Sequence, residues 1–538
     1  MKGEAVMLDV WRMKLSPQAF LERSARVFGD KEAVVYGSQR YNYAEMYRRV
    51  NRFASALQRA GIENGDRVAV LAPNVPAFLE AHYAVPLSGA ILVPINIRLS
   101  PKEVDFILDH SKPKMLFVDT QFTGLVEATL DRSSSIKIVN IPDGQEDKGL
   151  DGPDYESFLN TGTDEPLNWA DGDEDGLISI NYTSGTTGQP KGVMCSHRGA
   201  YLQSLGVALE MSLDNESRYL WTLPMFHCNG WCCTWSITAV GGLHVCLRKA
   251  DPEAVWNLIL EEKISHFCAA PTILVSLLSH QKAQEVHLGV KVRVVTAGAP
   301  PSPTLLGRVE SAGIEVIHQY GLTETYGPYT FCEWQAQWDG LSSNERAKIK
   351  ARQGVPLVTA DRVRVVNDSM EDVPADGKTL GEVVMRGNTS MKGYYKQPET
   401  TAEAFQGGWF HSGDLGVIHS DGYIELRDRK KDMIISGGEH IYSIELETAV
   451  AEHPDVLEVA VIAIPDDKWG EVPKAFVVPR PGANLTEEDI IEFARTRMAP
   501  YKRPKAVEFG DLPKTSTGKI QKHLLREREW GGLDKRIH

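Results

Sequence analysis

Short apolar runs alternate with longer amphipathic stretches along most of the chain. Near the N-terminus, residues 16–28 and 42–61 carry apolar positions at helical spacing and flank a strand-like run at 33–36. From residue 66 the alternation becomes regular, with strands and helices predicted in turn at 67–71, 77–87, 90–94, 101–110 and 115–118. This alternation predicts an α/β sheet wound by its connecting helices.

A second wound unit follows a polar connector. Residues 142–175 are rich in Asp, Glu, Gly and Pro and predict an exposed segment. Strand-like runs then recur up to about residue 330, at 219–223, 242–247, 266–270, 292–297 and 315–318. Ligands of wound sheets bind at the carboxyl ends of the strands, so we expect a nucleotide beside the segments 296–300 and 318–324.

The pattern changes again toward the C-terminus. Residues 381–386, 414–419 and 423–427 predict antiparallel strands, and Asp421-Gly422 is a hairpin signal between the last two. Beyond residue 430 the pattern predicts a compact α+β unit, with helices at 443–452 and 487–498 and strands at 456–464 and 474–478. The predicted class is α/β: a large N-terminal domain, residues 1–430, of wound sheets plus a small β-barrel-like unit, and a small α+β domain, residues 431–538.

Charge and cysteine usage narrow the function. A net charge of −14 argues against nucleic acid as a partner. The cysteines form no evenly spaced framework, which favours a reducing compartment. Those near His227 and His244 lack paired C-x-x-C spacing and lie among apolar neighbours, so buried thiols are favoured over a metal cluster; the seven are Cys195, Cys228, Cys232, Cys233, Cys246, Cys268 and Cys332.

The sequence predicts a protein without stable membrane insertion. The first residues lack the apolar run of a signal peptide, and the most apolar segment, 84–97, is short and interrupted by proline. The last three residues are no peroxisomal signal. We therefore expect a cytoplasmic enzyme, and leave open whether it forms a homodimer.

The segment 182–192 has the composition of a phosphate-binding loop. It reads Tyr-Thr-Ser-Gly-Thr-Thr-Gly-Gln-Pro-Lys-Gly and follows an apolar, strand-like run. Its glycines let backbone N–H groups approach an anion, its hydroxyls donate, and its lysine brings a positive charge; the residues are Thr183, Ser184, Gly185, Thr186, Thr187, Gly188 and Lys191. Because Lys191 is followed by Gly192, the spacing does not fit a P-loop NTPase. The alternative reading is a flexible surface loop.

Three further positions suggest nucleotide chemistry. Glu324 follows a glycine turn, where its carboxylate can reach a Mg²⁺ on phosphate oxygens, although a structural turn explains the segment as well. Asp414 precedes a strand and suits ribose hydroxyls, with Arg429 as a second contact, or else caps a turn. Lys519, in the glycine-containing loop 513–519, can stabilise a negatively charged transition state if the small domain closes, or is simply solvated.

Taken together, these motifs resemble the adenylate-forming superfamily of acyl-CoA synthetases, coumarate-CoA-type ligases and luciferases. The resemblance covers essentially the whole chain. Its carriers, in the family's order, are the segments 182–192, 319–324, 381–382, 394–395, 409–414, 423–438 and 513–519.

The resemblance implies a two-step reaction. A carboxylic acid and ATP would give an acyl-adenylate and pyrophosphate, and the thiol of CoA would then displace AMP. It implies Lys519 as the catalytic lysine, with His227 and Glu324 beside it, Mg²⁺ on Glu324 and Thr183, and a mobile C-terminal domain hinged at Lys431. Implied for the nucleotide, beyond the phosphate loop, are Gly298, Ala299, Pro300, Gln319, Tyr320, Gly321, Thr323, Asp414, Arg429, Lys431, Gly437 and Gly438.

The segment 224–231 matches the family's acyl gate. His227 and Trp231 are four residues apart, which places them on one face of a helical turn. We interpret the segment as a wall of the acid site, formed by His227, Trp231, Trp235, Gly298, Gly321 and Pro328; the alternative is ordinary aromatic core. The residues of this segment resemble those of methylmercaptopropionate-CoA ligases and plant acyl-activating enzymes. This resemblance implies a short, medium-chain, thioether or small aryl acid.

Several alternatives stay open. A luciferase would share nearly every motif. A stand-alone amino-acid adenylation domain is disfavoured because the acyl gate shows no acidic partner for an amine. A non-catalytic acyl-adenylate or nucleotide binder would not need Lys519. A serine hydrolase is set aside, because no G-x-S-x-G occurs.

Overall fold

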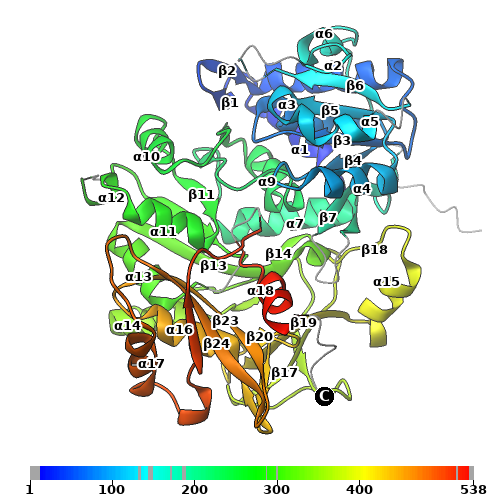
Figure 1. The fold of residues 1–538 in the computed structure, drawn as a ribbon. Helices are drawn as coiled ribbons and strands as arrows, with labels where there is room; N and C mark the ends of the chain where they lie inside the picture. Colours follow the sequence, from blue (N-terminus) through cyan, green and yellow to red (C-terminus); the bar gives the residue numbers. More distant parts are fainter. Residues whose placement is uncertain are drawn as a thin grey trace, which may run out of the picture.

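The computed structural model describes residues 13–130, 135–142, 144, 149–169, 172–183, 190–285, 288–298, 301–515 and 519–531. These residues form a large N-terminal unit and a smaller C-terminal one, drawn in orange and red in Figure 1. The chain is α/β, as the alternation of strands and helices predicted.

The first sheet runs in the order β18-β8-β7-β4-β3-β5-β6. Its strands are β3 (Arg67–Leu71), β4 (Ile91–Pro94), β5 (Met115–Asp119), β6 (Lys137–Ile141), β7 (Leu177–Thr183), β8 (Lys191–Ser196) and β18 (Gly393–Tyr394). Strands β4, β3, β5 and β6 are parallel to their neighbours, whereas β8 and β18 are antiparallel. The helices from this stretch are α1 (Gln18–Val27), α2 (Tyr43–Arg59), α3 (Pro76–Leu87), α4 (Pro101–Ser111), α5 (Glu127–Leu130), α6 (Tyr155–Leu159) and α7 (His197–Glu210).

The second sheet runs in the order β15-β14-β13-β12-β11-β9-β10-β1-β2. Its strands are β1 (Glu32–Tyr36), β2 (Gln39–Asn42), β9 (Arg218–Leu220), β10 (Leu243–Val245), β11 (His266–Ala269), β12 (Val292–Thr296), β13 (Ile314–Leu322), β14 (Gly327–Phe331) and β15 (Val355–Pro356). The intervening helices are α8 (Cys228–Trp231), α9 (Cys233–Val240), α10 (Pro252–Glu261), α11 (Pro271–Ser279), α12 (Lys282–Glu285), α13 (Pro303–Ser311) and α14 (Ser343–Lys350).

A third, antiparallel sheet completes the N-terminal unit. It runs β16-β17-β19-β20, with bounds β16 (Arg364–Val366), β17 (Gly381–Met385), β19 (Phe410–Ile418) and β20 (Ile424–Arg429), and α15 (Pro398–Ala404) lies beside it. An antiparallel bridge between Gly354 and Ile424 ties it to the end of the second sheet. The hairpin predicted at Asp421-Gly422 joins β19 to β20, with Gly422 at a φ of 83°.

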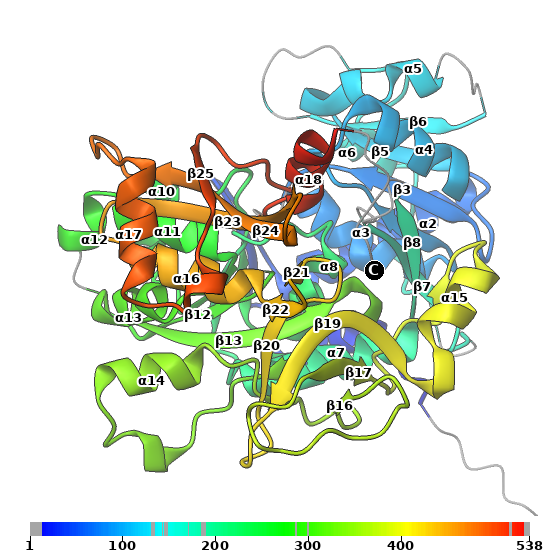
Figure 2. The same cartoon turned by 60° about the horizontal axis from the view of Figure 1, so that its bottom comes forward.

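The C-terminal unit packs a mixed sheet against helices. Its elements are β21 (Ile434–Ser436), β22 (Glu439–Ile441), α16 (Ser443–Ala451), β23 (Val456–Asp466), β24 (Gly470–Pro479), α17 (Glu487–Arg495), β25 (Ala506–Phe509) and α18 (Lys522–Trp530). Strands β22, β21, β24 and β23 are antiparallel to their neighbours, and β25 pairs with β24 in parallel. Figures 1 and 2 both show this unit lying against the second sheet and the antiparallel sheet.

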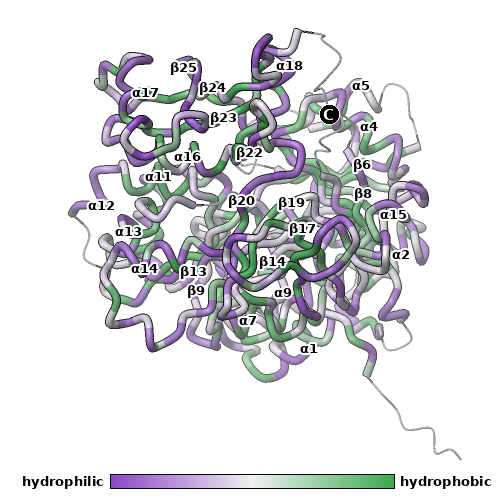
Figure 3. The backbone as a smooth tube through the Cα atoms, turned by 90° about the horizontal axis from the view of Figure 1, so that it is seen from below, coloured by the Kyte–Doolittle hydropathy of each residue, from purple (hydrophilic) through white to green (hydrophobic). Residues whose placement is uncertain are grey.

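Helix boundaries follow capping chemistry. Ser100 and Glu103 form a capping box at the start of α4, and Asn42 accepts from the backbone of Glu45 at the start of α2. Ser196 caps α7 by accepting from Gly199 N, so the helix begins directly after β8. In Figure 3 the central strands are largely hydrophobic, whereas the surface helix α14 is mainly hydrophilic.

Two expectations were wrong in detail. The polar connector is not exposed throughout, because it contains α6, whose Tyr155, Phe158 and Leu159 are buried; the Tyr155 hydroxyl donates to Glu80. Strand β13 does not end at His318 but continues to Leu322, because residues 319–322 pair with the antiparallel strand β14.

Two further expectations concern the cysteines, predicted to be buried thiols, and the membrane, into which no stable insertion is predicted. All seven cysteines are free and buried, and no group of three or more metal-ligating side chains occurs among the residues that the structure describes. Within the same residues, no helix has the length and apolar character needed to cross a membrane.

Candidate active site

The two ends of the phosphate-binding loop lie side by side. Thr183 closes β7, Lys191 opens β8, and the two residues are direct partners in this antiparallel pair. The Lys191 ammonium lies 4.9 Å from the centre of the Tyr394 ring, a cation–π contact. Ser184, Gly185, Thr186, Thr187 and Gly188 lie outside the described residues. The sheet thus fixes where the loop starts and ends.

Glu324 lies in a short turn beyond β13. Its carboxylate accepts a hydrogen bond of 2.9 Å from the Tyr394 hydroxyl, and its backbone carbonyl accepts one of 2.7 Å from Met391 N. Burial and the neighbouring Glu324 raise the pKa of Tyr394, which therefore stays a donor at neutral pH. Tyr394 links Lys191 to Glu324, a role that the sequence motif did not reveal.

Asp414 and Arg429 face each other across β19 and β20. The two residues are register partners, and Arg429 Nε lies 3.2 Å from Asp414 Oδ1. The other oxygen of Asp414 accepts a hydrogen bond of 2.7 Å from the Tyr320 hydroxyl. Burial, and then the charge of Asp414, raise the pKa of Tyr320 well above its ordinary value. The Asp414 carboxylate is thus held from both sides and is only 5% exposed.

Lys519 comes from the C-terminal unit and meets this pair. Its backbone N–H donates to Thr515 Oγ1 at 3.1 Å, and its carbonyl accepts from Thr515 N at 2.7 Å, which closes the loop that carries it. Burial, and then the charge of Arg429, lower the pKa of Lys519 to about 7, with Asp414 opposing the shift. The structure thus brings Lys519 near Asp414 and Arg429, which precede it by about a hundred positions in the chain.

Lys431 lies two residues after Arg429, at the junction of the two units. It is half-buried, and burial followed by the charge of Arg429 lowers its pKa to about 8. The cations Arg429, Lys431 and Lys519 and the anions Asp414 and Asp432 therefore share one neighbourhood. Such a cluster of perturbed groups is typical of a functional site.

The acyl-gate segment forms a helical turn, and this turn is left-handed. Residues 228–232 all have positive φ, between 47° and 62°. The N–H groups of Gly230 and Trp231 donate to His227 O at 2.9 and 3.3 Å. A Cβ at Gly230 would lie 2.4 Å from the Trp221 ring, so a glycine is required here by close packing as well as by φ.

His227 and the two tryptophans differ in exposure. Burial, and then the charge of Lys519, lower the pKa of His227 to about 4, so its imidazole is neutral at pH 7. Trp231 is 5% exposed and packs against Gly327, where a Cβ would lie 3.4 Å from its Cα. Trp235 is fully buried, and its indole donates to His82 O at 3.3 Å.

The remaining candidates lie on the second sheet and in the C-terminal unit. Gly298 follows β12 with a φ of 90°, and Ala299 and Pro300 lie outside the described residues. Gln319 is buried in β13, where Gly321 faces Pro328 of β14, and Thr323 Oγ1 accepts from Cys228 Sγ at 3.4 Å. Gly437 and Gly438 form the exposed turn between β21 and β22, and Gly437 N donates to Trp469 O.

Comparison with known proteins identifies this arrangement. The family model of the AMP-binding enzyme matches residues 21–395, and that of the AMP-binding enzyme C-terminal domain matches residues 445–519. An acetate–CoA ligase of Humulus lupulus, CCL3, is 46% identical over 97% of this chain and 96% of its own. A 4-hydroxybutyrate–CoA ligase of Metallosphaera sedula is 45% identical over 96% and 95%.

A solved structure shares the fold over nearly its whole length. The anthranilate CoA ligase AuaEII in complex with anthranoyl-AMP superposes with a TM-score of 0.86 at 25% identity, covering 96% of this chain and 98% of that one. The sequence relatives are CoA ligases matched from end to end. The chain belongs to the family of AMP-binding enzymes.

Proposed function

We propose that this AMP-forming acyl-CoA ligase activates a short- or medium-chain carboxylic acid, thioether and small aryl acids included. The acid and ATP give acyl-AMP and pyrophosphate, and the thiol of CoA then displaces AMP to give acyl-CoA. One observation carries the proposal: Lys519 of the C-terminal unit lies half-buried within electrostatic reach of Asp414, Arg429 and His227. A protein that only binds nucleotide has no need to bring a lysine there.

Each charged group has a role in the adenylation step. The acid carboxylate attacks the α-phosphorus, the bond to the bridging oxygen breaks, and pyrophosphate leaves with its electrons. Lys519, in its protonated form, would bridge the attacking carboxylate and the α-phosphate, both of which carry negative charge. Lys191 and Thr183 would hold the outgoing phosphates, and Asp414 with Arg429 would hold the ribose.

The residues present fit a Mg²⁺ ion. Mg²⁺ prefers oxygen ligands and is commonly held by one or two carboxylates together with substrate phosphates. Glu324 supplies a carboxylate of which Tyr394 engages one oxygen, and Thr183 supplies a hydroxyl at the start of the phosphate loop. When bound, the ion would neutralise charge on the phosphates. Tyr394 would keep the Glu324 carboxylate oriented for it.

The junction at residues 430 and 431 is suited to a hinge. Asp428 at the end of β20 accepts from Ser443 N at 2.6 Å and from Ser443 Oγ at 2.9 Å, and Lys522 Nζ donates to the same Oγ at 2.7 Å. Lys522 also pairs with Glu447 at 2.6 Å. We therefore place the domain boundary here: polar contacts of this kind can be exchanged, whereas a large apolar interface could not.

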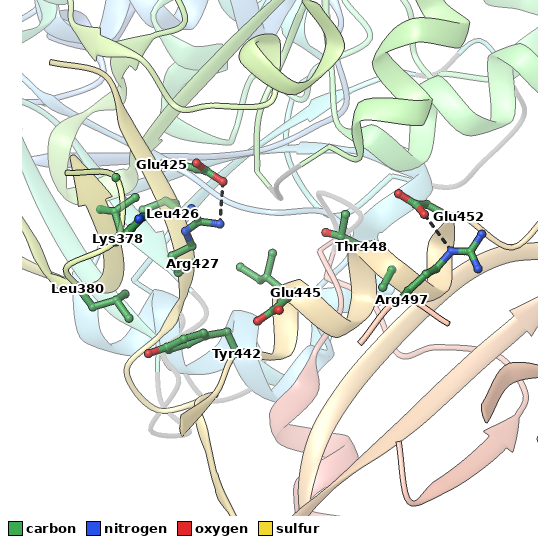
Figure 4. Close-up of a pocket in the computed structure, with 14 residues that line it drawn as sticks. Lys378, Leu380, Glu425, Leu426, Arg427, Tyr442, Glu445, Thr448, Glu452 and Arg497 are labelled. Carbon is green, nitrogen blue, oxygen red and sulfur yellow. Dashed lines mark hydrogen bonds and ion pairs between the residues drawn. The ribbon is translucent and has the colours of Figure 1, made fainter. Parts of the chain in front are cut away.

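A cavity beside the junction supports the same interpretation. It measures about 630 Å³ and is lined by residues of both β20 and α16. Figure 4 shows two ion pairs on its walls, Arg427 with Glu425 and Arg497 with Glu452. The two units thus meet with open space between them, which leaves room for the rotation that would withdraw Lys519 and admit CoA.

The acid site favours small substrates. Trp231 fills space next to Gly327, and His227 is neutral, so the wall offers an apolar ring and no fixed charge. The relatives named for acetate and 4-hydroxybutyrate are consistent with a small acid. Methylmercaptopropionate has a suitable size and polarity. The free, buried thiols fit a cytoplasmic location.

The function is tested by ATP–pyrophosphate exchange across straight-chain, thioether, branched and aromatic acids, followed by AMP release with and without CoA. We expect exchange with one group of small acids and a CoA-dependent thioester product. Exchange without thioester would indicate another acceptor or luciferase-like chemistry. ATP binding without exchange for any acid would indicate a non-catalytic binder.

Lys519→Ala should abolish adenylation and spare thioester formation from a supplied acyl-adenylate. The reason is that the lysine acts only on the α-phosphate, and domain rotation removes it before CoA reacts. The measurement is single-turnover kinetics of each half-reaction, in which we expect a loss of about 100-fold or more in the first step alone. Equal losses in both steps would contradict the two-orientation mechanism.

The rate of adenylation should fall as the pH rises through about 7. The active form of Lys519 is the cation, and its pKa of about 7 means that the free enzyme loses this proton there. His227, with a pKa of about 4, stays neutral and does not contribute to this limb. The kcat/KM of exchange between pH 6 and 9 measures the effect. Lys431→Ala removes a neighbouring cation, which should raise the pKa of Lys519 and move the fall in kcat/KM to higher pH. A wild-type kcat/KM that does not change with pH would contradict the role of protonated Lys519.

Trp231→Ala should admit longer or bulkier acids. Removing the indole opens space at the acid wall, so the chain-length optimum should shift upward with a gain of about 10-fold for the longer acid. The buried Trp256 of α10, whose indole donates to Leu277 O of α11 at 3.1 Å, provides the control as Trp256→Phe. An unchanged chain-length preference would show that Trp231 belongs to the core.

A further inference from the structure

The left-handed turn that follows His227 and includes Trp231 is a backbone conformation of high energy. Left-handed helical conformation is normally visited by single residues, mostly glycine, because Cβ approaches the following carbonyl. Here Cys228, Asn229, Trp231 and Cys232 adopt it together with Gly230. Such strain persists only where surrounding contacts enforce it, and it concentrates at functional sites. The contacts that enforce it are therefore part of the site.

Asn229 lies at the centre of those contacts. Its side chain is fully buried, and Asn229 Oδ1 accepts hydrogen bonds of 3.0 Å from both Ser179 Oγ and Asn181 Nδ2. Its backbone carbonyl accepts one of 3.1 Å from Thr234 Oγ1. Asparagine also tolerates positive φ better than most residues. One residue therefore supplies both the conformational tolerance and the anchor of the turn.

The anchor belongs to the strand that begins the phosphate loop. Ser179 and Asn181 lie on β7 with one residue between them, so they share a face with Thr183, the next alternate position. The Ser179 hydroxyl is also 3.2 Å from the Tyr326 hydroxyl, just beyond the turn that carries Glu324. The acid wall is thus tied by buried hydrogen bonds to the strand of the phosphate loop and to the segment after Glu324.

We propose that Asn229 is a positioning residue that determines acid specificity. By anchoring the left-handed turn to β7, it fixes the direction in which Trp231 and His227 face the acid site. It does not touch the substrate itself. The proposal deepens the function proposed above and rests on it, since the acid wall has meaning only for an acid-activating enzyme.

Three substitutions separate the two contributions of Asn229. Asn229→Gly keeps the freedom to adopt positive φ and removes the anchor, Asn229→Ala removes both, and Asn229→Asp keeps an oxygen acceptor for Ser179 and Asn181. Ser179→Ala removes one of the two donors and serves if a variant at position 229 does not fold. Asn51→Ala is the matched control: Asn51 of α2 is equally buried, donates to Tyr47 O of the same helix and accepts from Leu167 N, both at 2.8 Å.

The main readout is the ratio of kcat/KM between the preferred acid and one two methylenes longer, measured by pyrophosphate exchange. We expect this ratio to fall about 10-fold in Asn229→Gly, further in Asn229→Ala, and less in Ser179→Ala, while the KM for ATP changes less than about 3-fold. Asn229→Asp should recover most of the ratio. Asn51→Ala should lower the melting temperature without changing the ratio.

A crystal structure of Asn229→Ala tests the inference without reference to activity. We expect residues 228–232 to leave the left-handed region and the Trp231 ring to move, and Asn229→Asp to retain both. An unchanged turn, or equal loss of activity for every acid in Asn229→Gly, would overturn the inference. Failure of the wild-type enzyme to exchange with any acid would instead overturn the proposed function, and the crystal structure would still decide whether Asn229 holds the turn.

Discussion

The site depends on holding an ammonium group where cations already gather. Lys519 lies half-buried near Arg429 and Lys431, and this environment lowers its pKa to about 7. An amine that loses half its charge at neutral pH is destabilised in its protonated form, and the destabilisation is relieved when an anion arrives. The α-phosphate of ATP and the carboxylate of the acid are such anions. In the proposed mechanism, closure of the C-terminal unit would therefore be stabilised by the substrates that require it.

Much of the fold was predictable because local patterns and tertiary packing agree. Helical spacing of apolar residues predicted α2, α4 and α16 to within about two residues, and capping residues mark where the first two begin. The secondary structure of the polar segments was harder to predict. Strand β13 continues through Gln319 because β14 pairs with it, and a partner that lies beyond a turn leaves no periodicity in the strand itself. Tertiary contact overrides local composition in such places.

The sequence predicted which residues belong to the candidate site, but not the contacts between them. Sequence spacing indicated Asp414, Arg429 and Lys519, and the structure brings the three together. The sequence indicated no contact for Tyr394, whose hydroxyl donates to the distant Glu324. The hand of the turn at Trp231 was likewise hidden, because residues at i and i+4 share a face in a helix of either hand. Only buried partners distant in sequence, such as Ser179, decide between the two.

The proposed two-step reaction requires an acid wall that stays fixed and a lysine that can be withdrawn. The contacts that hold these two parts differ in kind. The acid wall is held by hydrogen bonds among fully buried neutral groups, and breaking them would leave unsatisfied donors in the core. Lys519 is held through a junction of charged residues, in which burial raises the pKa of Asp428 and brings that of Glu447 to about 6. Carboxylates that resist ionisation in this way gain hydration when the junction opens, which offsets the ion pairs lost. In the proposed mechanism, the junction would therefore open without large net cost, while the proposed acid wall would stay in place through both steps.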